Sequence, residues 1–179
     1  MKLRLVFILL LLLVAAGSTQ AQTDPAPNVE IKIPDGWESQ VAPNGSLAIT
    51  NNPAAATVPL LEPLPEDAVF VTIGTPFDIN SLIMNQGGDY LLGQFAIALI
   101  TIGGGINEDV SVPPLERVPE LDTNSITITF DSVPATFWVI AVPTKEKDVV
   151  MLALVKGEGY RDEIIQMLLT AELARPYDS

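Results

Sequence analysis

The sequence predicts an α+β domain in which a mainly antiparallel β-sheet is flanked by helices on its faces. Short segments that alternate or run continuously apolar follow one another between turn residues, which predicts strands joined by hairpins. Two longer segments, residues 89–102 and 162–174, place apolar residues at helical spacing. One sheet with two covering helices accounts for this pattern.

The amino-terminal segment has the three-part layout of a secretory signal. Lys2 and Arg4 precede a twelve-residue apolar run at positions 5–16, and the small residue Ala21 permits cleavage before Gln22. As a helix this run would rise only about 18 Å, short of the roughly 30 Å hydrocarbon core of a bilayer. We therefore expect a cleaved signal peptide, a secreted or extracytoplasmic protein, and no stable membrane insertion after cleavage.

Length and charge indicate one acidic domain. We divide the chain into a signal peptide at 1–21, a flexible lead-in at 22–28, a single domain at 29–175 and a tail at 176–179. Without Lys2 and Arg4, 7 basic residues remain against 22 acidic ones, a net charge of −15, so nucleic acid and anionic membranes are poor partners. The chain has no cysteine, which excludes disulfides and cysteine lipidation.

The first part of the domain predicts three short strands. Val29 to Ile33 alternate apolar and charged residues, and the Pro34-Asp35-Gly36-Trp37 corner ends that strand. After a second strand, Asn44-Gly45 suits a tight turn before a strand at 47–50. Asn44 also opens a formal glycosylation sequon, but we interpret the motif as the turn.

The middle of the chain predicts a long loop, a strand and a helix. Four prolines within residues 51–68 oppose a regular element, and a loop of this length is often functional or mobile. A strand at 69–74 and a short helical turn within 76–88 follow. Asp89 is expected to cap a helix that ends at the glycines 103–105. We interpret these glycines as a helix stop and not a phosphate loop, because they follow a helix and no lysine accompanies them.

The last part predicts three strands and a final helix. Residues 126–130 alternate, and residues 135–142 are apolar on both faces, as expected for a central strand covered on both sides. A polar hairpin at 143–148 leads to a strand at 149–155. Asp162 is expected to cap a helix through Ala174.

These features together resemble the PsbP-like superfamily. The resemblance rests on Pro34, Gly36 and Trp37 in a P-x-G-W corner, a middle helix, a T-I-T-F-D-S-V-P-A turn and a carboxy-terminal amphipathic helix, and it covers most of residues 29–174. It implies a PsbP-like α/β/α sandwich and a non-enzymatic accessory or binding role, and many members of the superfamily are exported bacterial proteins of unknown role. The family's photosynthetic function does not carry over, because no metal-retention or docking residues match.

No motif in the sequence predicts a catalytic site. The chain has no histidine and no cysteine, which removes Ser-His-Asp and Cys-His catalysis and almost every zinc or haem site. Acidic pairs supply oxygen ligands but lack the spacing of a calcium loop, so we expect at most weak cation binding. These pairs are Glu66-Asp67, Glu108-Asp109, Glu120-Asp122 and Asp162-Glu163. We therefore assign no catalytic, cofactor-binding or metal-binding residue and expect no cofactor.

Two aromatic residues have both a structural and a ligand-stacking interpretation. Trp138 lies within a continuous apolar strand, and Trp37 follows the glycine corner, so both are expected to pack in or against the core. Tyr90 and Tyr160 lie near helix starts, where packing or capping is the default.

Two function classes remain open. The first is an exported, non-catalytic interaction or ligand-binding module that presents the proline-rich loop 51–68 and the acidic loop 103–124 to a protein or small ligand. The second is a carboxylate-dependent extracytoplasmic hydrolase, which only the acidic pairs support. Two carboxylates facing each other in a pocket would favour the second, and solvated acids on a shallow surface would favour the first.

Overall fold

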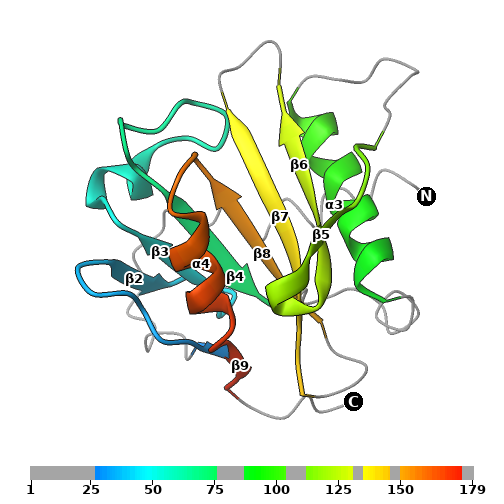
Figure 1. Cartoon of the computed structure of the whole chain (residues 1–179). Coiled ribbons are helices and arrows are strands. Elements are labelled where there is room, and N and C mark those ends of the chain that lie inside the picture. Colours follow the sequence, from blue (N-terminus) through cyan, green and yellow to red (C-terminus); the bar gives the residue numbers. More distant parts are fainter. Residues whose placement is uncertain (1–26, 76–86, 104–111, 131–134, 146–149, 175–179) are drawn as a thin grey trace.

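The computed structural model describes residues 27–75, 87–103, 112–130, 135–145 and 150–174. Within these ranges the chain is mixed α+β, with a seven-stranded antiparallel sheet and helices packed against it (Figure 1). The strand order across the sheet is β2-β3-β4-β8-β7-β6-β5. These strands are β2 (Glu38–Val41), β3 (Leu47–Thr50), β4 (Phe70–Gly74), β5 (Glu116–Val118), β6 (Thr123–Thr129), β7 (Thr136–Pro143) and β8 (Val150–Lys156).

The apolar strand β7 lies inside the sheet, as its sequence predicts. It pairs with β6 on one side and β8 on the other, with Trp138 opposite both Thr127 and Val155. Because side chains alternate along a strand, Trp138, Ile140 and Val142 face one side of the sheet, and Phe137 with its alternate neighbours faces the other. Both faces therefore need a cover, which the two helices provide.

The helix α4 (Arg161–Leu168) covers one face and α3 (Gly88–Ile102) covers the other. Ile164, Ile165, Met167 and Leu168 of α4 pack into a first core with the β3, β4, β7 and β8 side chains of that face. Leu92, Phe95, Ala96 and Leu99 of α3 pack into a second core with β6, β7 and Leu154. No helix in the described ranges is long and apolar enough to cross a membrane, and the apolar run at 5–16 lies outside them.

Both ends of the domain differ from the sequence prediction. Only Val29–Glu30 of the expected first strand is extended, as β1, and it pairs with β9 (Glu172–Leu173) instead of joining the large sheet. The final helix ends at Leu168 and not at Ala174. The reason lies in Thr170, whose hydroxyl donates to the Met167 carbonyl (2.7 Å) and accepts from the Lys32 amide (2.9 Å), so the chain leaves the helix to pair with the amino-terminal segment.

The expected helix caps are also corrected. The residue preceding α3 is Gly87, at φ 84°, and the residue preceding α4 is Tyr160, at φ 53°, and neither helix has a side-chain cap. Asp89 and Asp162 lie within the first turns, where their negative charge still suits the helix dipole. The predicted stop of α3 is confirmed, because the helix ends directly before Gly103. Gly103 is packed so closely that a Cβ there would lie 2.1 Å from Phe130 Cε1.

The Asn44-Gly45 turn forms as predicted. Gly45 has φ 82° and its amide donates to Ala42 O (2.8 Å), while Asn44 Oδ1 accepts from the Ser46 amide (3.1 Å). Asn44 Nδ2, the atom that would carry a glycan, is buried. The turn interpretation therefore fits, because the acceptor atom of the sequon is inaccessible.

The two loops expected to be irregular contain regular structure. Residues 51–68 include a 3₁₀ helix, η1 (Pro53–Thr57), which begins where Asn52 Oδ1 accepts from the Ala54 amide at 3.1 Å. Residues 103–124 include the edge strand β5 and a second 3₁₀ helix, η2 (Pro119–Leu121), with Val118 and Leu121 buried. Proline at the first position of each 3₁₀ helix explains the error, since proline is tolerated where no intrahelical amide is needed. Residues 76–86, 104–111, 131–134 and 146–149, which hold the predicted helical turn and two of the predicted turns, lie outside the described residues.

Candidate functional site

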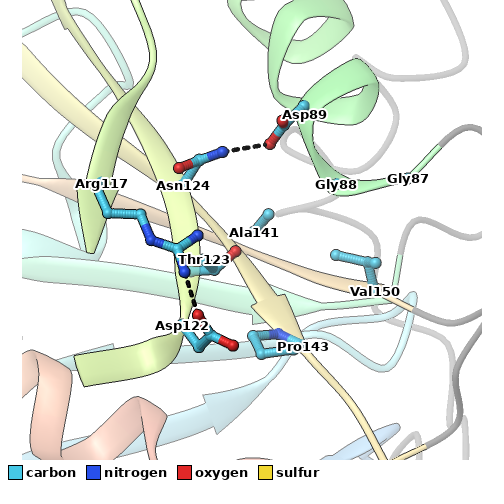
Figure 2. Close-up of a pocket in the computed structure, with 10 residues that line it drawn as sticks. All are labelled: Gly87, Gly88, Asp89, Arg117, Asp122, Thr123, Asn124, Ala141, Pro143 and Val150. Carbon is cyan, nitrogen blue, oxygen red and sulfur yellow. Dashed lines mark hydrogen bonds and ion pairs between the residues drawn. The ribbon is translucent and has the colours of Figure 1, made fainter. Parts of the chain in front are cut away.

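A pocket of about 390 Å³ opens to solvent where the first turn of α3 meets the β5–β6 edge of the sheet (Figure 2). Its polar wall combines the α3 start with side chains from β5, from Asp122 after η2 and from β6, and its apolar wall comes from β7 and β8. The lining residues are Gly87, Gly88, Asp89, Arg117, Asp122, Thr123, Asn124, Ala141, Pro143 and Val150.

Local sequence positions the helix start close to the sheet. Gly87 has φ 84°, a conformation that suits glycine, and begins the helix without a side-chain cap. A Cβ at Gly88 would lie 2.9 Å from Ala141 Cβ, so the first turn can approach β7 only because residue 88 is glycine. Gly87, Gly88 and Asp89 of that first turn therefore line the pocket.

The opposite wall is held by two polar contacts. Asn124 Nδ2 donates to Asp89 Oδ1 at 2.9 Å and joins β6 to α3. Arg117 pairs across β5–β6 with Asn124 and makes an ion pair with Asp122, which has a left-handed backbone (φ 51°) after η2 (Figure 2). Strand β5 and the 3₁₀ helix η2 that follows it thus bring the Asp122 carboxylate back to the Arg117 guanidinium.

The charged groups of the pocket are solvated. The Arg117 side chain is 53% exposed and that of Asp122 is 91% exposed. Asp89 is exposed as well, so one guanidinium and two carboxylates share an open, mixed polar and apolar surface. Among the described residues no group of three or more His, Cys, Asp or Glu side chains could hold a metal ion.

The acidic pairs predicted from sequence are dispersed and not assembled. Glu66-Asp67 lies at the end of the proline-rich loop, Asp162-Glu163 is exposed on the first turn of α4, and Glu108-Asp109 lies outside the described residues. Glu120-Asp122 contributes only Asp122 to the pocket. The second pocket carboxylate, Asp89, was expected only as a helix cap.

The two tryptophans are packed. Trp138 is 7% exposed and lies in the first core, with the Arg161 guanidinium 4.1 Å from its ring centroid. Trp37 is half-buried against the same core and meets Tyr160 edge-on, with ring centroids 5.7 Å apart. The predicted core position of Trp138 is confirmed, and Trp37 packs where a structural role requires it.

Sequence reasoning missed Lys156, which ends β8 and is only 4% exposed. Its Nζ donates to the Pro59 carbonyl at 2.7 Å, and burial lowers its pKa below 10.5 while the nearby Glu62 carboxylate acts in the opposite direction. The only sequence signal was a lysine that continues the apolar run of residues 149–155.

Comparison with known proteins shows no family. No protein-family model matches the chain, and no relative is found among curated proteins. A solved protein from Bacteroides thetaiotaomicron VPI-5482 is similar over 84% of this chain with 11% identity and a TM-score of 0.35. The match spans 47% of that protein, so this chain corresponds to about half of its length.

Proposed function

We propose that this chain is an exported, non-catalytic module that binds a small ligand in the pocket between α3 and the β5–β6 edge. The observation that carries the proposal is the combination of an apolar floor, formed by Ala141, Pro143 and Val150, with one guanidinium and two carboxylates at its rim. Binding sites typically pair an apolar lining with a few polar groups that fix orientation.

The charges favour a ligand that carries both signs. Arg117 and the uncapped first turn of α3 attract a carboxylate, since both offer N–H donors. Asp89 and Asp122 attract an ammonium group, and the chain's net charge of −13 disfavours a polyanion. A free amino acid, which carries an ammonium and a carboxylate on the same carbon and is not a polyanion, satisfies all three conditions.

Titration of the ¹⁵N-labelled secreted chain with four probes tests this proposal. The probes are leucine, its amine analogue isoamylamine, its carboxylate analogue 4-methylpentanoate, and glucose as a neutral control. We expect leucine to shift the amide signals of Gly88, Asp89 and Asn124 more than the other three probes do. Arg117→Met should remove the response, whereas Lys32→Met, a matched loss of an exposed cation elsewhere, should keep it. A lack of any pocket response to every probe contradicts the assignment.

A carboxylate-dependent hydrolase is the alternative, because Asp89 and Asp122 line one pocket. Against it, both carboxylates are exposed, and each is engaged, with Asn124 and Arg117 respectively. Turnover of a chromogenic glycoside or ester that disappears in both Asp89→Asn and Asp122→Asn would favour the hydrolase over the binding module.

Export and PsbP-like kinship are part of the same proposal. Export is supported by the signal-like residues 1–21, and kinship by the Pro34–Trp37 corner and the antiparallel sheet with helices against it. The intact mass of the secreted protein should correspond to a chain that begins at or near Gln22. A product that retains residues 5–16 would instead indicate a membrane anchor.

A further inference from the structure

The proline-rich segment 51–68, here called the strap, is a long connection whose two ends are held together by side chains. Asn51 Nδ2 donates to Asp67 O and Asn51 Oδ1 accepts from the Val69 amide, both at 2.8 Å. Thr50 Oγ1 adds a bond of 2.7 Å to Val69 O. These residues, Thr50, Asn51, Asp67 and Val69, are here called the neck. Their bonds hold the two ends of the strap together independently of its middle.

The middle of the strap is held against the α3 face of the sheet by one polar contact. Lys156 lies between Phe70 of β4 and Phe137 of β7, its side chain buried beneath the strap, and its Nζ donates to Pro59 O at 2.7 Å. Next to this bond, Leu60 and Leu61 are only partly buried against the second core. Two side chains of the strap are buried, Ala55 and, at its end, Ala68.

We infer that the strap opens as one unit, hinged at its neck, and that the Lys156–Pro59 hydrogen bond is the latch that keeps it closed. Segments with few buried apolar contacts detach from a native fold at lower free energy than the core does. A charged donor on a backbone carbonyl is among the stronger single contacts available to such a segment. Burial of the ammonium group opposes closure, as its lowered pKa indicates, so the latch holds against a desolvation cost.

Amide hydrogen exchange of the strap tests the latch. The reporter amides are those of Val58 and Glu62, which donate to carbonyls within the strap, and the reference amides are those of Val139 and Ala153 in the central strands. We expect Lys156→Met to raise exchange of the strap amides about tenfold, since methionine removes the charged donor and leaves Pro59 O only the Glu62 amide, while relief of desolvation offsets part of that loss. The reference amides should not change.

A second variant keeps the inference testable if Lys156→Met does not fold. Glu62→Gln removes the carboxylate that favours the charged lysine and should raise strap exchange about two- to fivefold. Glu66→Gln, an exposed carboxylate of the same strap, is the matched control and should leave exchange unchanged. Unchanged strap exchange in a folded Lys156→Met protein, or in Glu62→Gln, overturns the latch. An equal rise at the reference amides overturns opening of the strap as a separate unit.

Discussion

Gly157 gives the sharpest test of how closely the end of the strap packs on the sheet. It follows Lys156 with φ 105°, and a Cβ there would lie 2.6 Å from the Ala68 carbonyl oxygen and 3.2 Å from Leu64 Cδ1. The first atom belongs to the backbone, which cannot turn away as the end of a side chain can. Gly157→Ala should therefore combine backbone strain with a steric clash.

The magnitude follows from these two costs. A non-glycine residue at this φ costs about 1–2 kcal/mol, and an overpacked contact adds about 1–3 kcal/mol. Gly157→Ala should lower the free energy of unfolding by about 2–5 kcal/mol. For a domain of this size that corresponds to a loss of roughly 5–15 °C in Tm.

Gly159 supplies the matched control. Its φ is 90°, but nothing lies within 4 Å of a Cβ at that position, so Gly159→Ala incurs the strain without the clash. Urea denaturation of both variants should show Gly157→Ala less stable than Gly159→Ala by at least about 1 kcal/mol, the lower bound of the clash. Equal losses in the two variants would refute the close packing of the strap against β8.

Three further predictions concern the described core and its edges. Trp37→Ala should lower the free energy of unfolding, measured by urea denaturation, by about 2 kcal/mol. This is less than the loss of a fully buried tryptophan, because Trp37 is half-buried beside Tyr160. An unchanged midpoint would argue against a structural role. Arg161→Met should cost about 0.5–1 kcal/mol by removing the cation over Trp138, and a stability that does not change with this substitution would contradict that contact. Burial lowers the pKa of Lys156 in the folded protein, so the unfolded chain binds this proton more tightly than the folded one. The free energy of unfolding, taken relative to Lys156→Met, should therefore rise with pH between the lowered folded pKa and 10.5. A difference that falls over this range would contradict the burial of the charge.

Local patterns in the sequence were sufficient to predict the elements that depend mainly on neighbouring residues. The two-faced apolar run of β7 requires cover on both sides, and Asn44-Gly45 tolerates positive φ, so both predictions are confirmed. The start of α3 was predicted within a residue or two, although Gly87 and not Asp89 precedes it. The expected packing of Trp138 also followed from its strand alone.

Tertiary structure decided every feature that depends on residues far apart in the chain. Thr170 accepts a bond from Lys32, which ends the last helix early, and Lys156 reaches Pro59 across 97 positions. Asp89 and Asp122 share a pocket only because β5–β6 pairing brings Asp122, which follows η2, to the pocket at the start of α3. Periodicity and turn chemistry act over a few residues, whereas these contacts depend on which strand edges and helix ends the sheet brings together. The sequence alone therefore determined the inner strands of the sheet, the main turn and the covered faces, and the fold decided the edge strand β5, the pocket, the latch and the ends of the domain.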